Sequence, residues 1–198
     1  FKAHRDNPKL DVLVSEPVRN KGNGKWTFYL SRRLNDAAGQ FLGLVLLGIS
    51  TEYYSDFYAR ISLDGKASIT LLRDDFMIMA RWPVKETILG QYNLKGSTFA
   101  VIHDQKKTEG VILTDAPRKS YNDESGHPRM GAVHKVQKYP LIINYTIEEE
   151  VYLGVWRQNT RLIVLLAAGS ILAIVFSFSL LVRALQRREQ ALVETLRL

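Results

Sequence analysis

The stretch 162–182 reads LIVLLAAGSILAIVFSFSLLV, and it determines how the rest of the chain is interpreted. It contains 21 residues and no charge, and fourteen of its residues are Leu, Ile, Val or Phe. A helix of this length spans about 30 Å, which is the thickness of the hydrocarbon core of a bilayer. The alternative is a buried helix of a soluble domain, but such a helix rarely runs about six turns without a polar face. We therefore predict a transmembrane helix over residues 162–182.

The charges on either side of this stretch indicate its orientation. The residues after 182 include four arginines, whereas the residues just before the stretch include two, Arg157 and Arg161, which follow the acidic residues 148–150. Lys and Arg are more frequent on the cytoplasmic side of a membrane helix. We therefore expect residues 1–161 to be extracytoplasmic (periplasmic), next to a bacterial inner membrane, and the C-terminus to be cytoplasmic.

The composition limits the possible functions. The chain has 198 residues, begins at Phe1 without a signal peptide and ends at Leu198 within a helical pattern, so we expect a fragment of a longer protein that is cut at both ends. The net charge of +7 is spread along the chain, and no Lys/Arg run alternates with aromatic residues, so we expect no nucleic-acid partner. Cysteine is absent, which excludes disulfides, thiol catalysis and cysteine-ligated metals.

Residues 10–49 have the pattern of three strands. Apolar residues alternate over 10–14 and over 26–31, and the run 41–49 (FLGLVLLGI) is almost entirely apolar. Alternation is typical of a strand with one buried face, and a continuous apolar run is typical of a central strand that is covered on both faces. We predict an antiparallel meander in which the strand at 41–49 is central and buried.

A second module of the same kind follows. Aromatic residues at helical spacing predict a helix over 50–63, and strand patterns return at 68–72, 76–82, 110–114, 131–138 and 141–147. Each module ends with two long strands around a tight turn, followed by an aromatic helix. The sequence therefore predicts an α+β fold of two approximately repeated antiparallel-sheet modules, with the first truncated at its N-terminus.

The helical pattern after residue 148 contains no proline, so one helix or two nearly collinear helices are expected from the second sheet through the membrane. Small residues lie four apart at Gly169, Ala173 and Ser177, as in faces that allow two membrane helices to approach. Beyond them, Val182, Leu185, Glu189, Leu192 and Leu196 follow heptad spacing with one polar exception. Together these patterns favour a parallel homodimer.

Several stretches resemble the double Cache family, whose members are also called PDC sensors and are PAS-like. Residues 26–45 (WTFYLSRRLNDAAGQFLGLV) resemble the closing strands of the membrane-distal lobe, and residues 53–58 (YYSDFY) resemble the connector between lobes. Residues 68–83 (SITLLRDDFMIMARWP) resemble the start of the proximal lobe, and residues 136–144 (VQKYPLIIN) resemble its end. The likeness covers residues 1 to about 157.

The resemblance implies a domain order. It places the C-terminal part of the distal lobe at 1–50, the connector helix at 51–64 and the membrane-proximal PAS-like lobe at 65–148. A stalk helix would follow at 149–161, then the transmembrane helix at 162–182 and the start of a cytoplasmic signalling helix at 183–198. Proteins with such input domains are similar to sensor histidine kinases and membrane diguanylate cyclases, less often chemotaxis receptors.

The resemblance also implies where a ligand binds. The ligand usually lies in the distal lobe, and the positions that match the family's contacts are His4, Arg5, Trp26, Tyr29 and Arg33. Amino-acid-sensing members carry an Asp near the end of the last distal strand, where Gly48 stands in this chain, which argues against an amino-acid ligand. Because Arg offers a planar fork to a carboxylate, we expect a small carboxylate as the ligand. A solvated surface role for His4, Arg5, Arg32 and Arg33, and core packing for Trp26, are the alternatives.

Other polar residues do not form a recognisable catalytic or metal motif. His103, Asp104, His127 and His134 match no zinc spacing, and Asp115, Asp123 and Glu124 lack the spacing of an EF-hand. We expect no catalytic residue, no metal site and no cofactor in this fragment. The prediction is therefore the ligand-sensing input region of a bacterial transmembrane signalling protein. A membrane-anchored assembly or adhesion module and a tethered extracytoplasmic hydrolase are the alternatives from other classes.

Overall fold

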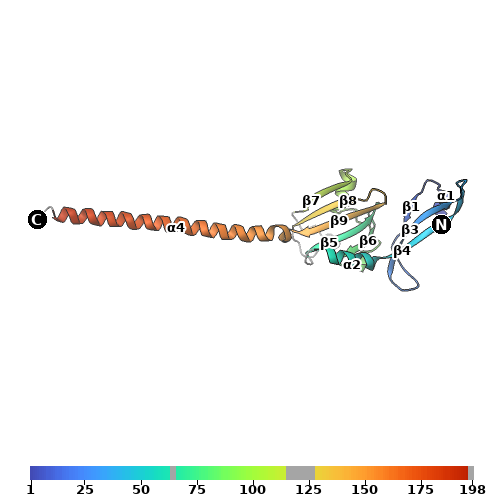
Figure 1. Ribbon diagram of the computed structural model, residues 1–198, viewed down its shortest axis with the longest axis horizontal. Helices are drawn as coiled ribbons and strands as arrows, with labels where there is room; N and C mark the ends of the chain where they lie inside the picture. Colours follow the sequence, from blue (N-terminus) through green and yellow to red (C-terminus); the bar gives the residue numbers. More distant parts are fainter. Residues whose placement is uncertain (63–65, 115–127, 196–198) are drawn as a thin grey trace. The chain divides into compact units, whose positions relative to one another are not determined.

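A computed structural model describes residues 1–62, 66–114 and 128–195, with side chains to residue 187. The chain divides into two units, Phe1–Val151 and Tyr152–Leu198. The first unit contains two antiparallel sheets (Figure 1). The residues Asp115, Asp123, Glu124 and His127, for which the sequence predicted no metal site, lie outside the described residues, as do the side chains of Glu189, Leu192 and Leu196.

The first sheet is built around β3 (Trp26–Asn35). The short strands β1 (Val12–Val14) and β2 (Val18–Arg19) pair with successive parts of β3, and β4 (Phe41–Ser50) pairs with it from residue 27 to residue 35. All of these pairings are antiparallel, which confirms the predicted meander. The short helix α1 (Lys2–Asp6) precedes the sheet and contacts β3 and β4.

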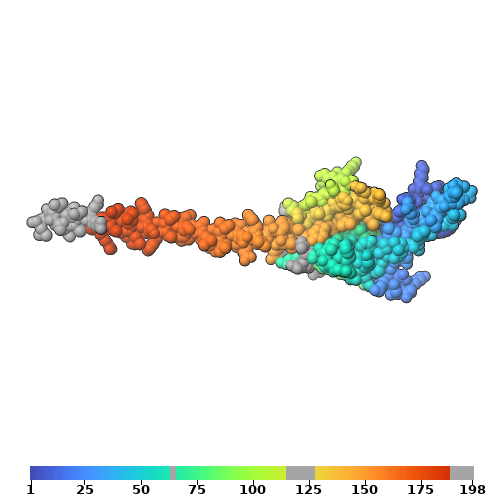
Figure 2. Space-filling view, viewed as in Figure 1, coloured from blue at the N-terminus to red at the C-terminus, as the bar shows by residue number. Residues whose placement is uncertain are grey.

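Helix α2 (Thr51–Ile61) follows β4 directly and leads to the second sheet, as predicted. Ser50 is its N-cap residue, and the Ser50 hydroxyl accepts a hydrogen bond from the Glu52 N–H. The buried side of α2 packs against β6, where the Ser55 hydroxyl donates to the carbonyl of Arg81 at 3.0 Å. Figure 2 shows atoms of both β4 and α2 at the surface of this unit.

The second sheet has the strand order β6-β5-β9-β8-β7. Its strands are β5 (Ala67–Arg73), β6 (Ile78–Trp82), β7 (Glu109–Thr114), β8 (Arg129–Lys135) and β9 (Leu141–Glu148). Three short helical turns connect β6 to β7: η1 (Glu86–Ile88), α3 (Ser97–Phe99) and the π-helical turn η2 (Ala100–Asp104). Strand β9 lies in the middle, because it pairs with β5 on one side and with β8 on the other.

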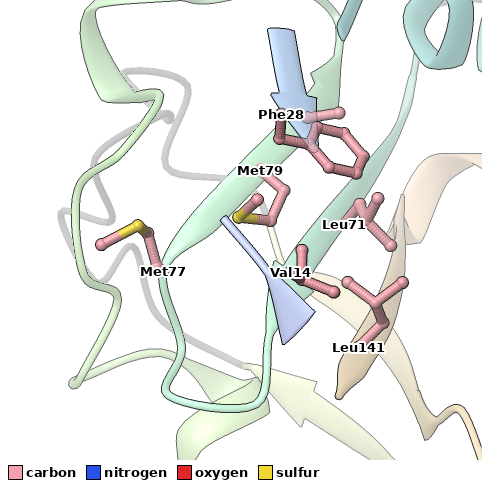
Figure 3. Packing of buried hydrophobic residues seen from close by; sticks show 7 residues of the cluster. Val14, Phe28, Leu71, Met77, Met79 and Leu141 are labelled. Atoms are coloured by element: carbon pink, nitrogen blue, oxygen red, sulfur yellow. The ribbon is translucent and has the colours of Figure 1, made fainter. Parts of the chain in front are cut away.

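Each face of the second sheet carries its own core. On one face, Val14 and Phe28 of the first sheet pack with Leu71, Met79 and Leu141 of the second, as Figure 3 shows. On the other face, the strand residues Leu72, Ile78, Val133 and Ile142 pack with Phe76 and with Ile88 and Val101 of the helical turns. The two sheets therefore share one core, and the second sheet has another of its own.

One prediction about the first sheet is wrong. The apolar run at 41–49 had predicted a central strand that is covered on both faces, but β4 lies at an edge of the described sheet and pairs only with β3. Four of its side chains are between half and 70% exposed: Leu42, Val45, Leu46 and Leu47. The run has the composition of a covered strand, but the described residues leave these four side chains largely uncovered.

The second unit is most of α4, which runs from Glu149 to Thr195 and contains the predicted stretch 162–182. Among the described residues, α4 is the one helix that is long and apolar enough to cross a membrane. None of its most apolar window is buried by the rest of the chain. Long apolar side chains exposed in this way need a nonaqueous partner, since a soluble protein rarely leaves so large a contiguous apolar surface in water.

Candidate functional site

The first sheet presents a polar face around His4. Because side chains alternate along a strand, Thr27, Tyr29, Ser31 and Arg33 lie on one face of β3. The His4 side chain is fully buried, and its Nε2 is 2.8 Å from the Ser31 Oγ. The Ser31 hydroxyl also lies within 3.5 Å of the Leu13 carbonyl, to which it donates. This pattern fits a His4 ring that is protonated at Nε2 and has its lone pair on Nδ1.

The Nδ1 atom of His4 is buried and has no hydrogen-bond partner in the described part of the chain. A buried polar atom without a partner costs about 1–3 kcal/mol, so native proteins contain few of them. Such an atom is more frequent where a ligand or water completes the site. His4 therefore supplies an unused acceptor next to Ser31.

Arg33 is held in place by the backbone of α1. Its Nη1 donates to the carbonyl of His4 and, at 3.3 Å, to that of Arg5, and its Nε donates to the Asn35 Oδ1. These carbonyls belong to the C-terminal end of a helix, where a cation is favoured. Its guanidinium also lies 4.7 Å from the centre of the Phe41 ring. Among the described residues the Nη2 of Arg33 has no partner, which leaves two donors in a fixed position.

Tyr29 lies on the same face and covers Gly48, which is directly opposite it on β4. A Cβ atom added to Gly48 would be 2.9 Å from the Tyr29 Cε1, closer than such atoms approach. The ring of Tyr29 therefore occupies the position where an acidic side chain at 48 would stand. The Tyr29 hydroxyl accepts a hydrogen bond of 3.5 Å from the Asn20 side chain.

The other two predicted residues lie elsewhere. Trp26 belongs to the opposite face of β3, where the Arg19 guanidinium lies 5.0 Å from its ring, and its Nε1 is buried without a partner in the described residues. The Arg5 side chain is exposed and paired with Asp6 at 2.7 Å. That contact raises the pKa of Arg5 and lowers the pKa of Asp6. The structure thus brings together His4, Tyr29 and Arg33 on one face, without Trp26 and the Arg5 side chain.

Comparisons with known proteins address the fold. No family model matches the chain, and no curated protein matches its sequence. Among solved structures, it is similar to the extracellular domain of rpHK1S-Z16, which is described as a histidine kinase, with 29% identity and a TM-score of 0.60. The match covers 77% of this chain and 60% of that domain.

Two further structures have the same fold at lower identity. The extracellular domain of mmHK1S-Z3, also described as a histidine kinase, matches with 13% identity and a TM-score of 0.57 over 80% of this chain and 56% of that one. The periplasmic sensory domain of the chemoreceptor Tlp1 from Campylobacter jejuni matches with 13% identity and a TM-score of 0.56 over 75% and 54%. The chain has a Cache-type sensor-domain fold.

In this sensor domain, one residue of the polar face was missed by the sequence analysis. Ser31 lies between Tyr29 and Arg33 and bonds to His4. The period of two along β3 was sufficient to find it, because residues 29, 31 and 33 must share a face. The contact with His4 was not predictable, since it depends on where α1 lies on the sheet.

Proposed function

We propose that the sensor domain and α4 form the ligand-sensing and signal-input region of a bacterial transmembrane sensor, a histidine kinase or a diguanylate cyclase. The observation that carries this proposal is the direct succession of a Cache-type fold and a membrane-length helix. Strand β9 ends at Glu148 and α4 begins at Glu149, so no loop residue separates the sheet from the helix. A helix that begins at a central strand is suited to report changes in that sheet.

The proposed organisation follows the order implied by the family. Residues 1–50 form the C-terminal part of a distal lobe, 51–64 the connector and 65–148 the proximal lobe. Residues 149–161 form the stalk, 162–182 cross the inner membrane, and 183–198 begin the cytoplasmic signalling helix. The chain spans 60% of the similar rpHK1S-Z16 domain, so the output activity is part of the proposal.

The proposed ligand is a small carboxylate that binds on the polar face of the first sheet. The Arg33 Nη2 can donate to a carboxylate oxygen of the ligand, because the described contacts of Arg33 use only its Nε and Nη1. The His4 Nδ1 accepts from a hydroxyl or amine on the same ligand. Tyr29 borders this position. Trp26 lies on the other face of β3 and the Arg5 side chain pairs with Asp6, so neither is part of the proposed site. Amino-acid-sensing members of the similar family carry an Asp where Gly48 stands, and here the Tyr29 ring occupies the space of that side chain. This supports a ligand other than an amino acid.

Binding is tested with the full chain in detergent micelles by a thermal-shift screen of carboxylates, amines and sugars. A ligand that binds only the folded state raises its stability by about 2.7 kcal/mol at a hundredfold excess over Kd. Arg33→Gln should abolish the shift, whereas Arg32→Gln should preserve it, because Arg32 lies on the opposite face and pairs with Asp11. Equal shifts in both variants would contradict the proposed site, and the absence of any stabilising ligand favours an assembly module.

Orientation and signal transfer have separate tests. Since the chain has no cysteine, Asp11→Cys and Arg187→Cys report the two sides of the membrane by labelling of intact cells with an impermeant maleimide. Only Asp11→Cys should react. Val155→Pro in α4 should stop signal output of the full-length protein while ligand binding survives, because proline costs a helix about 3 kcal/mol. Val155→Ala is the matched control, and undiminished output from the proline variant contradicts transfer through α4.

The proposed parallel homodimer rests on the small residues of α4. Gly169 and its neighbours one and two turns along, Ala173 and Ser177, are exposed along one side of this helix. Gly169→Leu should weaken association in micelles, measured by energy transfer between labelled chains. Leu172→Ala, a size change outside the small-residue face, should have a smaller effect.

A further inference from the structure

A second polar cluster lies in the other module, on the face of the second sheet that carries the helical turns. Residues directly opposite each other in a sheet share a face, and here the pairs are Arg81–Thr70, Thr70–Asn144, Ser68–Thr146 and Thr146–Gly131. These pairs form a polar row on β6, β5 and β9. Gly131 borders it on β8, where the residue opposite Asn144 is the apolar Val133. None of these residues belongs to the site around His4, which lies on the first sheet.

The polar row replaces apolar residues on an interior face. One step further along the same strands, Leu72 and Ile142 are opposite each other and belong to the core beneath the helical turns. Yet Thr70, Asn144 and Thr98 are only 6%, 7% and 2% exposed. Burial of polar groups at positions that suit Leu or Ile is costly unless the groups are hydrogen-bonded. The hydrogen bonds of this row must therefore be followed group by group.

Hydrogen bonds within the cluster leave several donors unused. The Arg81 Nη1 donates to the Thr70 Oγ1 at 2.8 Å, and the Asn144 Nδ2 donates to the Thr98 Oγ1 at 2.7 Å. The Thr146 Oγ1 donates to the Asn144 Oδ1 at 2.7 Å. The second N–H of the Asn144 amide and the hydroxyl of Thr98 remain available. Among the described residues, the Ser97 hydroxyl makes no hydrogen bond.

These groups surround a point where the sheet has no side chain. A Cβ atom added to Gly131 would lie 3.5 Å from the Ser97 Oγ, 3.6 Å from the Thr146 Oγ1 and 4.0 Å from the Asn144 Nδ2. Polar atoms of Ser97 on α3 and of Asn144 and Thr146 on β9 thus converge above Gly131. A network that only attached α3 to the sheet would need Asn144 and Thr98, but it would not need Ser97 or a glycine at 131.

We propose that this cluster is a second ligand site, in the proximal module, that takes a small carboxylate. A carboxylate is an acceptor only, and the unused groups of Ser97, Thr98 and Asn144 are donors. Arg81, whose Nη1 donates to the Thr70 Oγ1, lies on the same face of the sheet. The ligand approaches over Gly131, where a side chain would stand in its way. This site is separate from the proposed function, because its residues, sheet and module differ from those around His4.

The test uses the full chain in micelles, labelled with nitrogen-15, and titrates acetate against chloride at equal ionic strength. The side-chain amide of Asn144 and the backbone amide of Gly131 should shift and saturate. Gly131→Ala should weaken acetate binding at least tenfold without unfolding, since its Cβ makes ordinary contacts only. Gly43→Ala, a matched change on β4 where the added Cβ meets nothing within 4 Å, should bind as the wild type does.

Two results would overturn the proposal. One is the absence of saturating shifts at Asn144 and Gly131 up to about 50 mM acetate, a generous limit for a ligand of so few atoms. The other is equal binding by the wild type and Gly131→Ala. Ser97→Ala is a second variant that removes a hydroxyl without a described hydrogen bond; it should weaken binding severalfold while the melting temperature stays constant. Shifts near Tyr29 and Arg33 instead would assign acetate to the first sheet alone.

Discussion

Strand β4 is almost entirely apolar and strand β9 contains both apolar and polar residues, yet β9 has the more buried surroundings. Strand β9 pairs on both edges, and its residues Leu141, Ile142 and Ile147 are buried. Strand β4 pairs on one edge, and its Val45, Leu46 and Leu47 are 54–58% exposed. Edge strands are usually protected by charged residues, yet residues 41–50 contain none. The apolar composition of a strand thus indicates that it requires burial. It does not show which other part of the fold buries it.

The first sheet packs into a core that it shares with the second sheet, whereas the second sheet has another core of its own. Phe28→Ala tests this difference and should have the largest effect on stability. Phe28 is fully buried, stacks with Tyr54 at 5.7 Å and belongs to the core that both sheets share. Its truncation should cost about 3–5 kcal/mol of unfolding free energy. Urea unfolding in micelles can be followed through Trp26 in the first sheet and Trp82 in the second, with the other tryptophans replaced by phenylalanine.

The outcome shows whether the two sheets unfold together or separately. If the shared core joins the sheets into one cooperative unit, Phe28→Ala lowers the midpoint equally for both reporters. Ile142→Ala is the matched control in the core that belongs to the second sheet alone, with a cost of about 2–5 kcal/mol. A Phe28→Ala variant in which Trp82 reports an unchanged midpoint contradicts a shared core.

The second prediction concerns Gly48 on β4, which lies opposite Tyr29. Alanine at 48 places a Cβ 2.9 Å from the Tyr29 ring, so that ring must move. Overpacking of this kind costs about 1–3 kcal/mol. Tyr29→Ala should relieve it, so the double variant Gly48→Ala/Tyr29→Ala should show a coupling energy in a double-mutant cycle. Additive effects of the two substitutions would mean that the ring does not lie over Gly48.

Much of this architecture was predictable from the sequence, because strands and helices leave periodic patterns. Helix α2 and most of the strands follow from periods of 3.6 and 2. Strand β4 follows from its continuous apolar run, and the long helix follows from the length and lack of charge of 162–182. The exposure of β4 did not follow, because an apolar run contains no information about its partners. The pairing of His4 with Ser31, 27 residues apart, and the convergence of Ser97, Asn144 and Gly131 depend on packing between elements rather than on local pattern.

The third prediction concerns the junction between the sheets, where Arg73 connects β5 to β1. Its Nη1 donates to the Val14 carbonyl at 3.1 Å, and its guanidinium binds both carboxylate oxygens of Asp75. The hydrogen bond from Arg73 lowers the pKa of Asp75 below its ordinary value of 3.8. The ionised form is therefore the one that the folded state favours. Stability from this group is complete above pH 3.8 and is lost as the pH falls through the lower, folded-state pKa.

Asp75→Asn should therefore reduce the acid sensitivity of the melting temperature below about pH 4. The effect at neutral pH should be small, below about 1 kcal/mol, because the Asp75 side chain is partly exposed and solvent screens the pair. Asp11→Asn, which removes an exposed partner of Arg32, is the control. Identical pH profiles for the wild type and Asp75→Asn would show that this carboxylate does not stabilise the junction.

The smallest effect is expected at the exposed edge itself. Leu47→Ser removes an apolar side chain that is 58% exposed, so the isolated chain should lose at most about 0.5 kcal/mol, as is usual for surface positions. The same change at the buried position of the other sheet, Ile142→Ser, should cost several times more. Unfolding should be measured at several protein concentrations. A large effect of Leu47→Ser that grows with concentration would show that a second copy covers β4, and a large effect without that dependence would show that β4 is packed within one chain. Either result would make the edge strand resemble β9, and the contrast between the two strands would then disappear.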